Sequence, residues 1–562
     1  MNLIPKVNGR VVTHKGKLTV YEPLGYQGEL LDPSFAMRFG LLEARDGVLY
    51  FSQDPAIPPE GYKLIINQEG IEISSSSRAG QFYGLITLQS LLREGRMGML
   101  EISSKIPYME IEDAPRFSHR GFMLDVSRHF TGVTEIEKVL EQMALLKMNV
   151  FHWHLSDDQG YRIESKAFPK LNSVGSVLYP GQATDGSKRG YYTWDEIREV
   201  VSFAAERNIM VIPEIDLPGH TSAIIAAYPE LSCDGTPGEV KKGGGIFPKI
   251  LCGGDPKVYD FLYQLLDEVT TLFPAPYFHL GGDEAPKAEW AKCEKCQAMI
   301  RKKDLGSEEG LQAYFTEQLV RYLALKGKTA IGWNEILQSG RLAADTIELP
   351  EEAPASVGAP ICQYWAERGK TYAYPEVKKG QRFIFSNNPC FYLDYPHAMV
   401  TMKAAYLMEP NIDWNFEIPE DQVLGFEAPL WTERVGDISY LEHQVFPRLL
   451  AVAENGWTKE RDYDEFLERV KAYEAVLKEF GVDPTSWQDA DVHGKEGVRL
   501  IVQELQRMRG EFQQTDIELP EEVKKEFAES GKRFMEGFFH YSYSEEDQAY
   551  LGELLAEELK NL

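Results

Sequence analysis

The chain has 562 residues, which is too long for one ordinary domain and predicts two or three domains. Acidic residues outnumber basic ones by 87 to 59, and the resulting formal net charge of −28 disfavours nucleic acid and anionic membranes as partners. No apolar run reaches 18 residues, and the N-terminus lacks the apolar segment of a secretory signal. We therefore expect no membrane span, and a cytoplasmic location unless a signal segment has been removed.

Residues 1–114 have the pattern of an α+β domain. Short strand-like runs occur at 17–22, 61–67 and 70–76, and the stretch 80–94, "GQFYGLITLQSLLRE", has a helical pattern. No group of catalytic residue types stands out in this segment. We interpret it as an accessory domain that supports the rest of the chain.

Residues 115–484 alternate between strand-like and helix-like segments. The eight strand-like runs are 120–126, 149–156, 209–217, 276–284, 329–337, 361–365, 382–387 and 423–431. Eight strands separated mostly by amphipathic helices predict a (β/α)8 TIM barrel with long loops. An open doubly wound sheet is the alternative, but no GxGxxG motif follows a strand.

The last segment, 485–562, is charged and has a helical pattern. Such a helical extension is a candidate either for packing on the barrel or for forming a homodimer. The sequence does not decide between these two roles.

Six cysteines are too few for a disulfide scaffold in a chain of this length. "CEKC" at 293–296 is one CxxC pair, but a zinc site would need a second pair or histidines at ligand spacing, and none follows nearby. We therefore interpret the CxxC pair as a chance occurrence or a structural turn, with a metal or redox role as the alternative, and we predict no metal and no cofactor. Cys233 and Cys252 are candidates for closing a loop through a disulfide.

Polar and aromatic residues gather where the predicted strands end, which is where the active sites of barrel enzymes lie. These residues are Arg120 and Asp125 on strand 1; His152, His154, Asp157 and Asp158 on strand 2; Glu214, Asp216 and His220 on strand 3; Asp283 and Glu284 on strand 4; Trp333 and Glu335 on strand 5; Trp365 on strand 6; Tyr392 and Asp394 on strand 7; and Trp431 and Glu433 on strand 8. Tryptophans beside carboxylates are typical of a sugar-binding site, because indole rings stack on the C–H faces of a pyranose.

Asp283 and Glu284 are adjacent, so they cannot easily flank a glycosidic bond as two separated carboxylates do. We therefore expect the two acids to have different roles. One acid protonates the leaving oxygen, and the other orients a 2-acetamido group of the substrate that attacks its own anomeric carbon. The pair therefore indicates substrate-assisted hydrolysis of a 2-acetamido sugar.

Several motifs resemble the β-N-acetylhexosaminidases of glycoside hydrolase family 20. They are "RGFMLDVSRHF" (120–130), "FHWHLSDDQGYRIE" (151–164), "PEIDLPGH" (213–220), "HLGGDEAP" (279–286) and "APLWTE" (428–433), in matching order. "QFYGLITLQSLL" (81–92) is similar to the end of that family's N-terminal domain. The resemblance covers roughly residues 1–480 and leaves out the helical tail.

The resemblance implies an exo-acting, retaining enzyme that removes terminal β-linked GlcNAc or GalNAc from glycans or glycoconjugates. Glu284 would be the general acid/base, Asp283 would orient the acetamido group, and Tyr392 would hydrogen-bond the acetamido oxygen. The remaining implied roles are Asp157 and His220 as residues that tune Glu284, Arg120 on the 3- and 4-hydroxyls, Trp333, Trp365 and Trp431 as walls, Asp394 and Glu433 on the outer hydroxyls, and Trp414 at the leaving-group side.

Three other kinds of protein are alternatives to this interpretation: a metal-dependent hydrolase, a non-catalytic sugar-binding protein and a chitinase-like enzyme. "HWH" at 152–154 has the form of a strand-end metal pair in some barrel hydrolases, but after His279 the only histidines of the barrel segment are His397 and His443, and neither is at a predicted strand end. The structural interpretation, in which His152 and His154 pack in the barrel and form hydrogen bonds in a polar layer, is therefore favoured. A non-catalytic sugar-binding protein would keep the tryptophans but would not need the adjacent Asp-Glu pair. A chitinase-like enzyme would carry a DxxDxDxE strand, which this sequence lacks.

Overall fold

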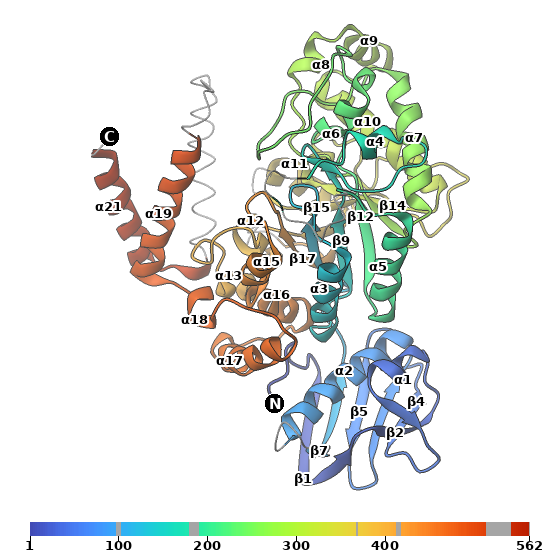
Figure 1. The fold of residues 1–562 in the computed structure, drawn as a ribbon, viewed down its shortest axis with the longest axis vertical. Helices are drawn as coiled ribbons and strands as arrows, with labels where there is room; N and C mark the ends of the chain where they lie inside the picture. The colour runs from blue at the N-terminus through green and yellow to red at the C-terminus, as the bar shows by residue number, and fades with distance from the viewer. Residues whose placement is uncertain are drawn as a thin grey trace.

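The structure is a computed structural model that describes residues 1–96, 103–178, 182, 190–366, 369–411, 417–512 and 541–560. Trp414, one of the predicted site residues, lies outside the described residues. An N-terminal β-sheet domain lies at one end of the molecule, a barrel lies above it, and a pair of C-terminal helices lies at the side of the barrel (Figure 1).

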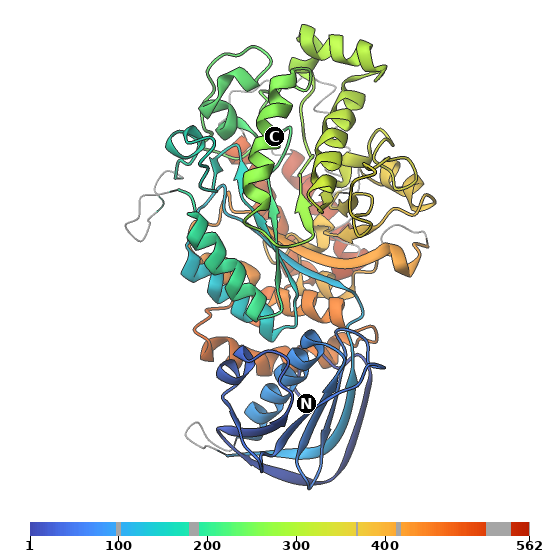
Figure 2. The same ribbon diagram turned by 90° about the vertical axis from the view of Figure 1, so that its right-hand side faces the viewer.

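The N-terminal domain contains a seven-stranded mixed sheet in the order β1-β7-β5-β6-β4-β2-β3. Its strands are β1 (Arg10–Tyr21), β2 (Leu24–Gly28), β3 (Leu41–Glu43), β4 (Leu49–Gln53), β5 (Tyr62–Ile66), β6 (Ile71–Ser75) and β7 (Ser103–Asp113). The strand β5 alternates buried and half-buried residues, as expected for a sheet with one covered face. Figure 2 shows this curved sheet below the barrel.

The helix α2 (Arg78–Gly95) packs on the sheet and also faces the barrel. The Ser77 hydroxyl accepts a hydrogen bond from the Gly80 backbone N–H and caps the helix. Phe82 and Leu85 are buried in the core, while Tyr83 contacts the barrel helix residue Trp457 with ring centroids 5.1 Å apart. The predicted helix 80–94 is therefore confirmed, and it joins the sheet to the barrel.

Eight parallel strands close into a barrel in the order β12-β13-β14-β15-β16-β17-β8-β9. They are β8 (His119–Asp125), β9 (Val150–His154), β12 (Met210–Glu214), β13 (Tyr277–His279), β14 (Thr329–Trp333), β15 (Ile361–Tyr364), β16 (Phe383–Phe385) and β17 (Val423–Leu430). A small hairpin, β10 (Ser156–Asp157) and β11 (Gly160–Tyr161), follows β9. The closed barrel confirms the predicted fold class and excludes the open doubly wound sheet.

Helices surround the barrel and fill the loops that follow its strands. The other described helices are α1 (Ser34–Arg38), α3 (Val133–Leu145), α4 (Lys170–Ser173), α5 (Trp194–Glu206), α6 (Ser222–Ala227), α7 (Pro256–Thr270), α8 (Ala288–Lys292), α9 (Glu294–Lys303), α10 (Glu308–Leu325), α11 (Lys370–Val377), α12 (Asn388–Phe391), α13 (Met402–Leu407), α15 (Ile438–Val445), α16 (Arg448–Trp457), α17 (Tyr463–Glu479), α18 (Trp487–Ala490), α19 (Gly494–Phe512) and α21 (Glu545–Lys560), with short 3-10 turns η1 (Pro229–Leu231), η2 (Asn334–Leu337) and η4 (Glu420–Gln422). Among the residues described, no helix combines the length and apolar character needed to cross a bilayer.

The barrel interior is apolar at one level and charged at the next. Val150, Ile212, Ile331, Ile361 and Ile384, from five different strands, pack together as one buried cluster. Side chains alternate along a strand, so the inward position two residues after Val150 is His152. The apolar layer closes the barrel below, and a polar layer supports its carboxyl end.

Arg120 lies at the junction between the two domains. It is the second residue of β8, and its guanidinium donates to Glu60 at 2.8 and 3.1 Å and to the Tyr83 hydroxyl at 3.0 Å. Its Nε donates to the Lys147 carbonyl at 2.9 Å. Because the Arg120 side chain is only 1% exposed, this ion pair is a buried part of the domain interface.

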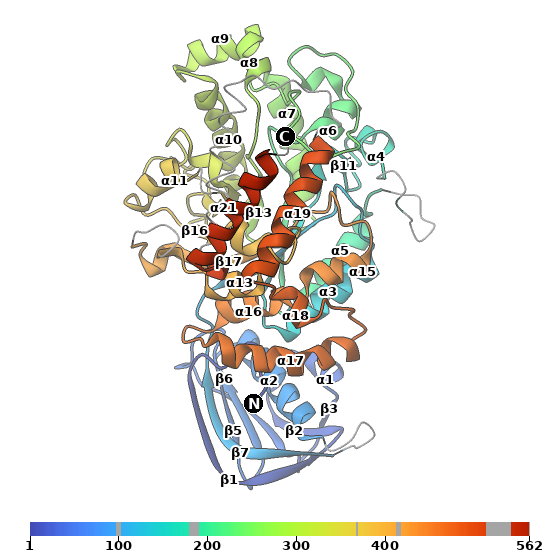
Figure 3. The same ribbon diagram turned by 90° about the vertical axis from the view of Figure 1, so that its left-hand side faces the viewer.

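The C-terminal helices α19 and α21 lie side by side and pack on the barrel near α13 (Figure 3). Val498 and Ile501 of α19 and Tyr543 pack in one cluster with Met399. The Tyr543 hydroxyl also donates to the Ala398 carbonyl at 2.6 Å. Packing on the barrel, one of the two predicted roles of this segment, is therefore confirmed for the described residues.

We predict that Arg120→Gln destabilises the protein because it leaves Glu60 without its buried partner. The expected loss is about 3 kcal/mol, measured as a shift of the urea unfolding curve. Arg198→Gln is the matched control, since Arg198 pairs with Asp195 at the surface with 55% and 94% of the side chains exposed. That change should cost less than about 1 kcal/mol. Equal losses in the two variants would contradict this view of the interface.

Candidate active site

The turn after β13 brings two adjacent carboxylates to the carboxyl end of the barrel. The strand ends at His279, and Gly281 (φ +64°), Gly282 (φ +104°) and Glu284 (φ +46°) then adopt left-handed backbone conformations. The Gly282 N–H donates to Asp216 at 3.0 Å, and a Cβ at Gly281 would lie 1.8 Å from that carboxylate. Only glycine fits so close a contact. In a strand, Asp283 and Glu284 would point to opposite faces, but the turn ends the strand before them, so both side chains can face the same site.

His220 lies between the two carboxylates. Its Nε2 is 3.9 Å from a carboxylate oxygen of Asp283 and 3.9 Å from one of Glu284. Its Nδ1 lies 3.1 Å from Asp157 and 3.2 Å from Asp158. Burial opposes a positive charge on the ring, but Asp157 and Asp158 outweigh it and raise the pKa of His220 well above its usual value. His220 is therefore a cation that faces both acids.

Asp283 is the acid that burial affects strongly. Burial raises its pKa to about 7, an effect that the His220 cation opposes and that Glu335 and Glu284 reinforce. Its Oδ1 is buried and has no hydrogen-bond partner in the described part of the chain. A buried carboxylate oxygen without a donor is costly, which is typical of an atom that binds a ligand.

Aromatic rings form a continuous wall beside the acids. Trp365 stacks on Tyr392 with ring centroids 6.1 Å apart and planes at 21°. Trp431 lies 6.3 Å from Tyr392 and 5.8 Å from Trp333. The Trp333 Nε1 donates to Glu214 at 2.9 Å, and the Trp365 Nε1 donates to Glu335 at 3.1 Å. These hydrogen bonds orient the Trp333 and Trp365 indoles within the wall.

The predicted contact of Arg120 with a substrate is wrong. On β8 the neighbouring Gly121 faces the barrel interior, where a Cβ would lie 2.5 Å from Glu427. Arg120 therefore points outward, and it lies at the amino end of the strand, among domain-interface residues.

Arg128, which lies beyond the carboxyl end of β8, is the arginine at the site. Its guanidinium nitrogens lie 2.8 Å from Asp157, 3.2 Å from Asp125 and 3.6 Å from Glu433. Its guanidinium carbon lies 5.0 Å from the centre of the Trp431 ring. The motif "RGFMLDVSRHF" contains both arginines, and the rule that active sites lie at the carboxyl ends of the strands favours the second one.

Asp394 and Glu433 lie at the outer side of the aromatic wall. Burial, reinforced by the Glu433 charge, raises the pKa of Asp394 to about 7. The Oδ1 of Asp394, like that of Asp283, is buried and has no hydrogen-bond partner among the described residues. The site therefore offers two separate carboxylate oxygens to a ligand.

A charged layer of histidines and glutamates supports the site from below. Glu214 lies 3.0 Å from His152 and 2.9 Å from His279, and it also bonds to His154. Burial opposes the charge of Glu214, but these histidines hold its pKa well below the usual value. Glu427 accepts from the second nitrogen of His152 at 2.7 Å. His152 and His154 are thus members of a hydrogen-bonded polar layer, as the structural interpretation of "HWH" predicts.

We predict that Asp283→Asn stabilises the fold, most strongly at alkaline pH. A folded-state pKa of about 7 against an ordinary value of 3.8 adds stability below pH 4 that is lost as the pH rises through 7. The melting temperature of the variant should exceed that of the wild type by about 1 to 4 °C at pH 8, and by less at pH 5. Asp46→Asn, at an exposed loop position, is the control and should change neither value. A difference that does not depend on pH would contradict the burial of charge at Asp283.

Comparison with known proteins gives matches for both domains. Residues 117–460 match the model of the glycosyl hydrolase family 20 catalytic domain, and residues 36–114 match that of domain 2 of the same family. The β-hexosaminidase of Porphyromonas gingivalis is 37% identical over 448 residues, which are 76% of this chain and 55% of that protein. The Akkermansia muciniphila β-hexosaminidase is 32% identical over 448 residues, which are 76% of this chain and 86% of that protein. The chain spans about half the length of the first relative and 66% of a Vibrio furnissii β-hexosaminidase.

Solved structures agree with these matches. The β-N-acetylhexosaminidase of Bacteroides fragilis superposes with a TM-score of 0.74 at 30% identity, covering 87% of this chain and 99% of that one. A Vibrio harveyi family 20 exo-β-N-acetylglucosaminidase, solved in complex with N-acetylglucosamine, superposes with a TM-score of 0.73 at 27% identity. The superposition covers 86% of this chain and 78% of that one. The closed barrel, the Asp-Glu turn and the match over both domains lead to one conclusion: this chain belongs to glycosyl hydrolase family 20.

Proposed function

We propose that this protein is an exo-acting, retaining β-N-acetylhexosaminidase that works through its substrate's own acetamido group. One observation carries the proposal. The buried Asp283 presents a carboxylate oxygen that has no hydrogen-bond donor among the residues that the structure describes. It lies directly beside Glu284, and one histidine is 3.9 Å from both acids. An acetamido N–H is a donor that would satisfy this oxygen.

The spacing of the two acids argues against the widely separated carboxylate pair of an inverting glycosidase. Oxygen atoms of Asp283 and Glu284 and a nitrogen of His220 all lie within 4.8 Å of one another. An inverting enzyme separates its carboxyl groups by about 6.5 to 9.5 Å to admit a water molecule. Because the two acids are adjacent in sequence and share His220, they are suited to two neighbouring atoms of one sugar.

In the first step Glu284 donates its proton to the glycosidic oxygen while the bond from that oxygen to the anomeric carbon breaks. The acetamido carbonyl oxygen attacks the same carbon and forms an oxazolinium ion. Asp283 accepts a hydrogen bond from the acetamido N–H and balances the positive charge that develops there. The His220 cation favours the ionised form of Asp283, and Tyr392 donates to the acetamido oxygen.

In the second step Glu284, now a carboxylate, takes a proton from water. The resulting hydroxide equivalent attacks the anomeric carbon, the oxazolinium ring opens, and Glu284 is protonated again. Two inversions at one carbon give net retention. Asp157 contributes through His220, since it holds the ring in place from the side opposite the acids.

The remaining residues bind the sugar. Trp333, Trp365 and Trp431 surround the acetamido group and the ring, while Asp394, Glu433 and Arg128 take the outer hydroxyls. The unpartnered Oδ1 of Asp394 supports this role, because a sugar hydroxyl is the donor it lacks. Trp414 stays a prediction for the leaving-group side.

The substrates are glycans or glycoconjugates that end in a β-linked N-acetylhexosamine. The Vibrio harveyi relative was solved with N-acetylglucosamine, which supports a terminal GlcNAc. Acceptance of the galacto epimer depends on Asp394 and Glu433. A homodimer remains a further prediction for this chain.

Hydrolysis of the 4-nitrophenyl N-acetyl-β-glucosaminide and of its galacto epimer tests the proposal. We expect the wild type to release nitrophenol from at least one of them with retention of configuration, read by NMR of the first product formed. A thiazoline that mimics the oxazolinium ion should inhibit competitively. A protein that binds the thiazoline but hydrolyses neither compound would be a sugar-binding protein instead.

Glu284→Gln should separate acid catalysis from the acetamido step. On a disaccharide, whose leaving group needs a proton, the rate should fall about 10²- to 10⁴-fold. On the 4-nitrophenyl substrate the loss should be much smaller, because nitrophenolate leaves without a proton. Glu352→Gln, at an exposed loop position, serves as the matched control. Equal losses on the two substrates would mean that Glu284 is not the general acid.

A further inference from the structure

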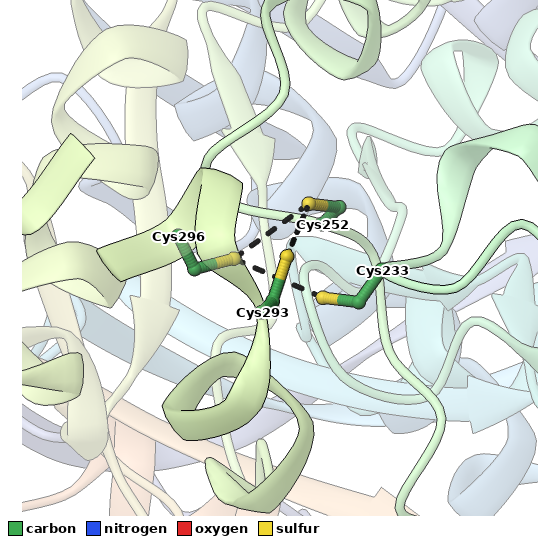
Figure 4. A group of neighbouring side chains, drawn as sticks. All are labelled: Cys233, Cys252, Cys293 and Cys296. Atoms are coloured by element: carbon green, nitrogen blue, oxygen red, sulfur yellow. Dashed lines mark hydrogen bonds between the residues drawn. The ribbon is translucent and has the colours of Figure 1, made fainter. Parts of the chain in front are cut away.

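Four cysteines from separate parts of the chain meet outside the catalytic site (Figure 4). Cys233 and Cys252 lie at the two ends of a long loop, while Cys293 precedes α9 and Cys296 lies in its first turn. Their four sulfur atoms all lie within 4.8 Å of one another. The prediction that no second ligand pair accompanies the CxxC pair is therefore wrong. The second pair comes from a loop some 40 to 60 residues earlier, a separation that spacing rules do not cover.

The distances between the sulfurs fit a metal ion and not disulfides. They are 3.6 Å for Cys252–Cys296, 3.8 Å for Cys252–Cys293 and 3.8 Å for Cys233–Cys296. A disulfide would bring two sulfurs to about 2.05 Å. A tetrahedral zinc ion with Zn–S bonds of about 2.3 Å has its sulfurs about 3.8 Å apart. These three distances match the edges of such a tetrahedron.

We propose that Cys233, Cys252, Cys293 and Cys296 bind one Zn²⁺ in a closed structural site. Four sulfur ligands select zinc or iron among the common metals, and four protein ligands leave no position for water or substrate. On binding, the four thiols lose four protons to solvent and the ion gains four thiolate ligands without any change of redox state. This site revises the expectation of no metal.

The backbone around the cysteines is built for close approach. A Cβ at Gly254 would lie 2.3 Å from the Cys296 nitrogen, so only glycine lets the Cys252 loop reach the start of α9. The Cys252 N–H donates to the Leu231 carbonyl at 2.8 Å, and a β-bridge joins Ser232 to Leu251. Lys295, inside the CxxC pair, reaches back to Asp255 at 2.6 Å. These contacts hold the two ligand pairs face to face without requiring the metal to pull them together.

The site lies at the base of a loop whose far end reaches the catalytic residues. No described helix or strand lies between Ser232 and Cys252. In this loop the Lys241 N–H donates to the Asp158 carbonyl at 2.9 Å, and the Gly243 carbonyl accepts from Gln159 at 2.8 Å. Asp158 is the residue that also contacts His220. A metal ion at the base would therefore add a fixed point to a loop whose far end contacts residues beside the candidate active site.

Metal analysis of the purified full-length protein tests the proposal directly. After dialysis against metal-free buffer, mass spectrometry of the elements should find about one zinc per chain. Cys252→Ser and Cys296→Ser should lose it, whereas Cys362→Ala, in the barrel strand β15, should keep it. If the serine variants do not fold, the zinc content of the wild type still tests the proposal. A mercurial reagent should release one equivalent of zinc, and a cobalt-substituted protein should show the intense visible bands of tetrahedral cobalt thiolate.

Several results would overturn the proposal. One is wild-type protein that contains no zinc and has six titratable thiols. Another is an intact mass 2 or 4 Da below the reduced value, which would mean disulfides among these cysteines. Iron in place of zinc would overturn the identity of the ion. All of these readouts are independent of glycoside hydrolysis, so they stand whether or not the proposed activity is found.

Discussion

Two carboxylates next to each other in the sequence can serve one substrate only if the chain turns between the end of the strand and the acids. In this protein the turn follows His279, and it requires left-handed backbone at two glycines and at Glu284. The turn is held from the segment that follows the neighbouring strand β12, since Asp216 accepts a hydrogen bond from the Gly282 N–H and occupies the space that a side chain at Gly281 would need. Everything proposed for the site depends on this local geometry. Without it, one acid would face the barrel interior and the other would face the surrounding helices.

Holding so many charges at the end of a barrel has a cost in free energy, and the structure offsets it with a polar layer. Glu214 and Glu427 each bind more than one histidine, and His152 connects the two carboxylates. Burial alone would lower the pKa of His152, but these two glutamates raise it to about 9. His152 is therefore a positive charge paired with a carboxylate on each side. Asp283 and Asp394, by contrast, have raised pKa values, and each has an oxygen without a partner in the described part of the chain, which marks them as residues suited to binding a ligand.

The pattern of the sequence predicts the architecture well, because period and order suffice for a barrel. All eight strand-like runs became strands, although β13 ends at His279 while the predicted run extended to Glu284. The difference arises because Gly281 and Gly282 leave the strand before the acids. The prediction places Arg120 at the site, whereas the structure places Arg128 there, and this error has a different cause. A motif shows that an arginine is present, but only the strand register shows that Arg120 lies at the amino end and points outward.

The cysteines mark the limit of prediction from spacing. A CxxC pair is visible in the sequence, whereas its partners Cys233 and Cys252 come from both ends of a long loop and meet it only in the folded chain. His220 differs in that the family resemblance groups it with Asp157 and Glu284, although residue spacing alone does not, because its position depends on three different strand ends. Contacts of this kind are set by tertiary packing, so a single sequence cannot supply them.

The central claim is that the substrate's acetamido oxygen, oriented by Asp283, is the nucleophile. The most direct measurement is the rate on 4-nitrophenyl glycosides whose N-acetyl group carries none, one, two or three fluorine atoms. Fluorine withdraws electrons from the carbonyl oxygen and weakens it as a nucleophile while hardly changing its size. The account predicts a steep stepwise fall of kcat/KM along the series. A rate that is insensitive to fluorination would mean that an enzyme carboxylate or water attacks instead, and would contradict the account.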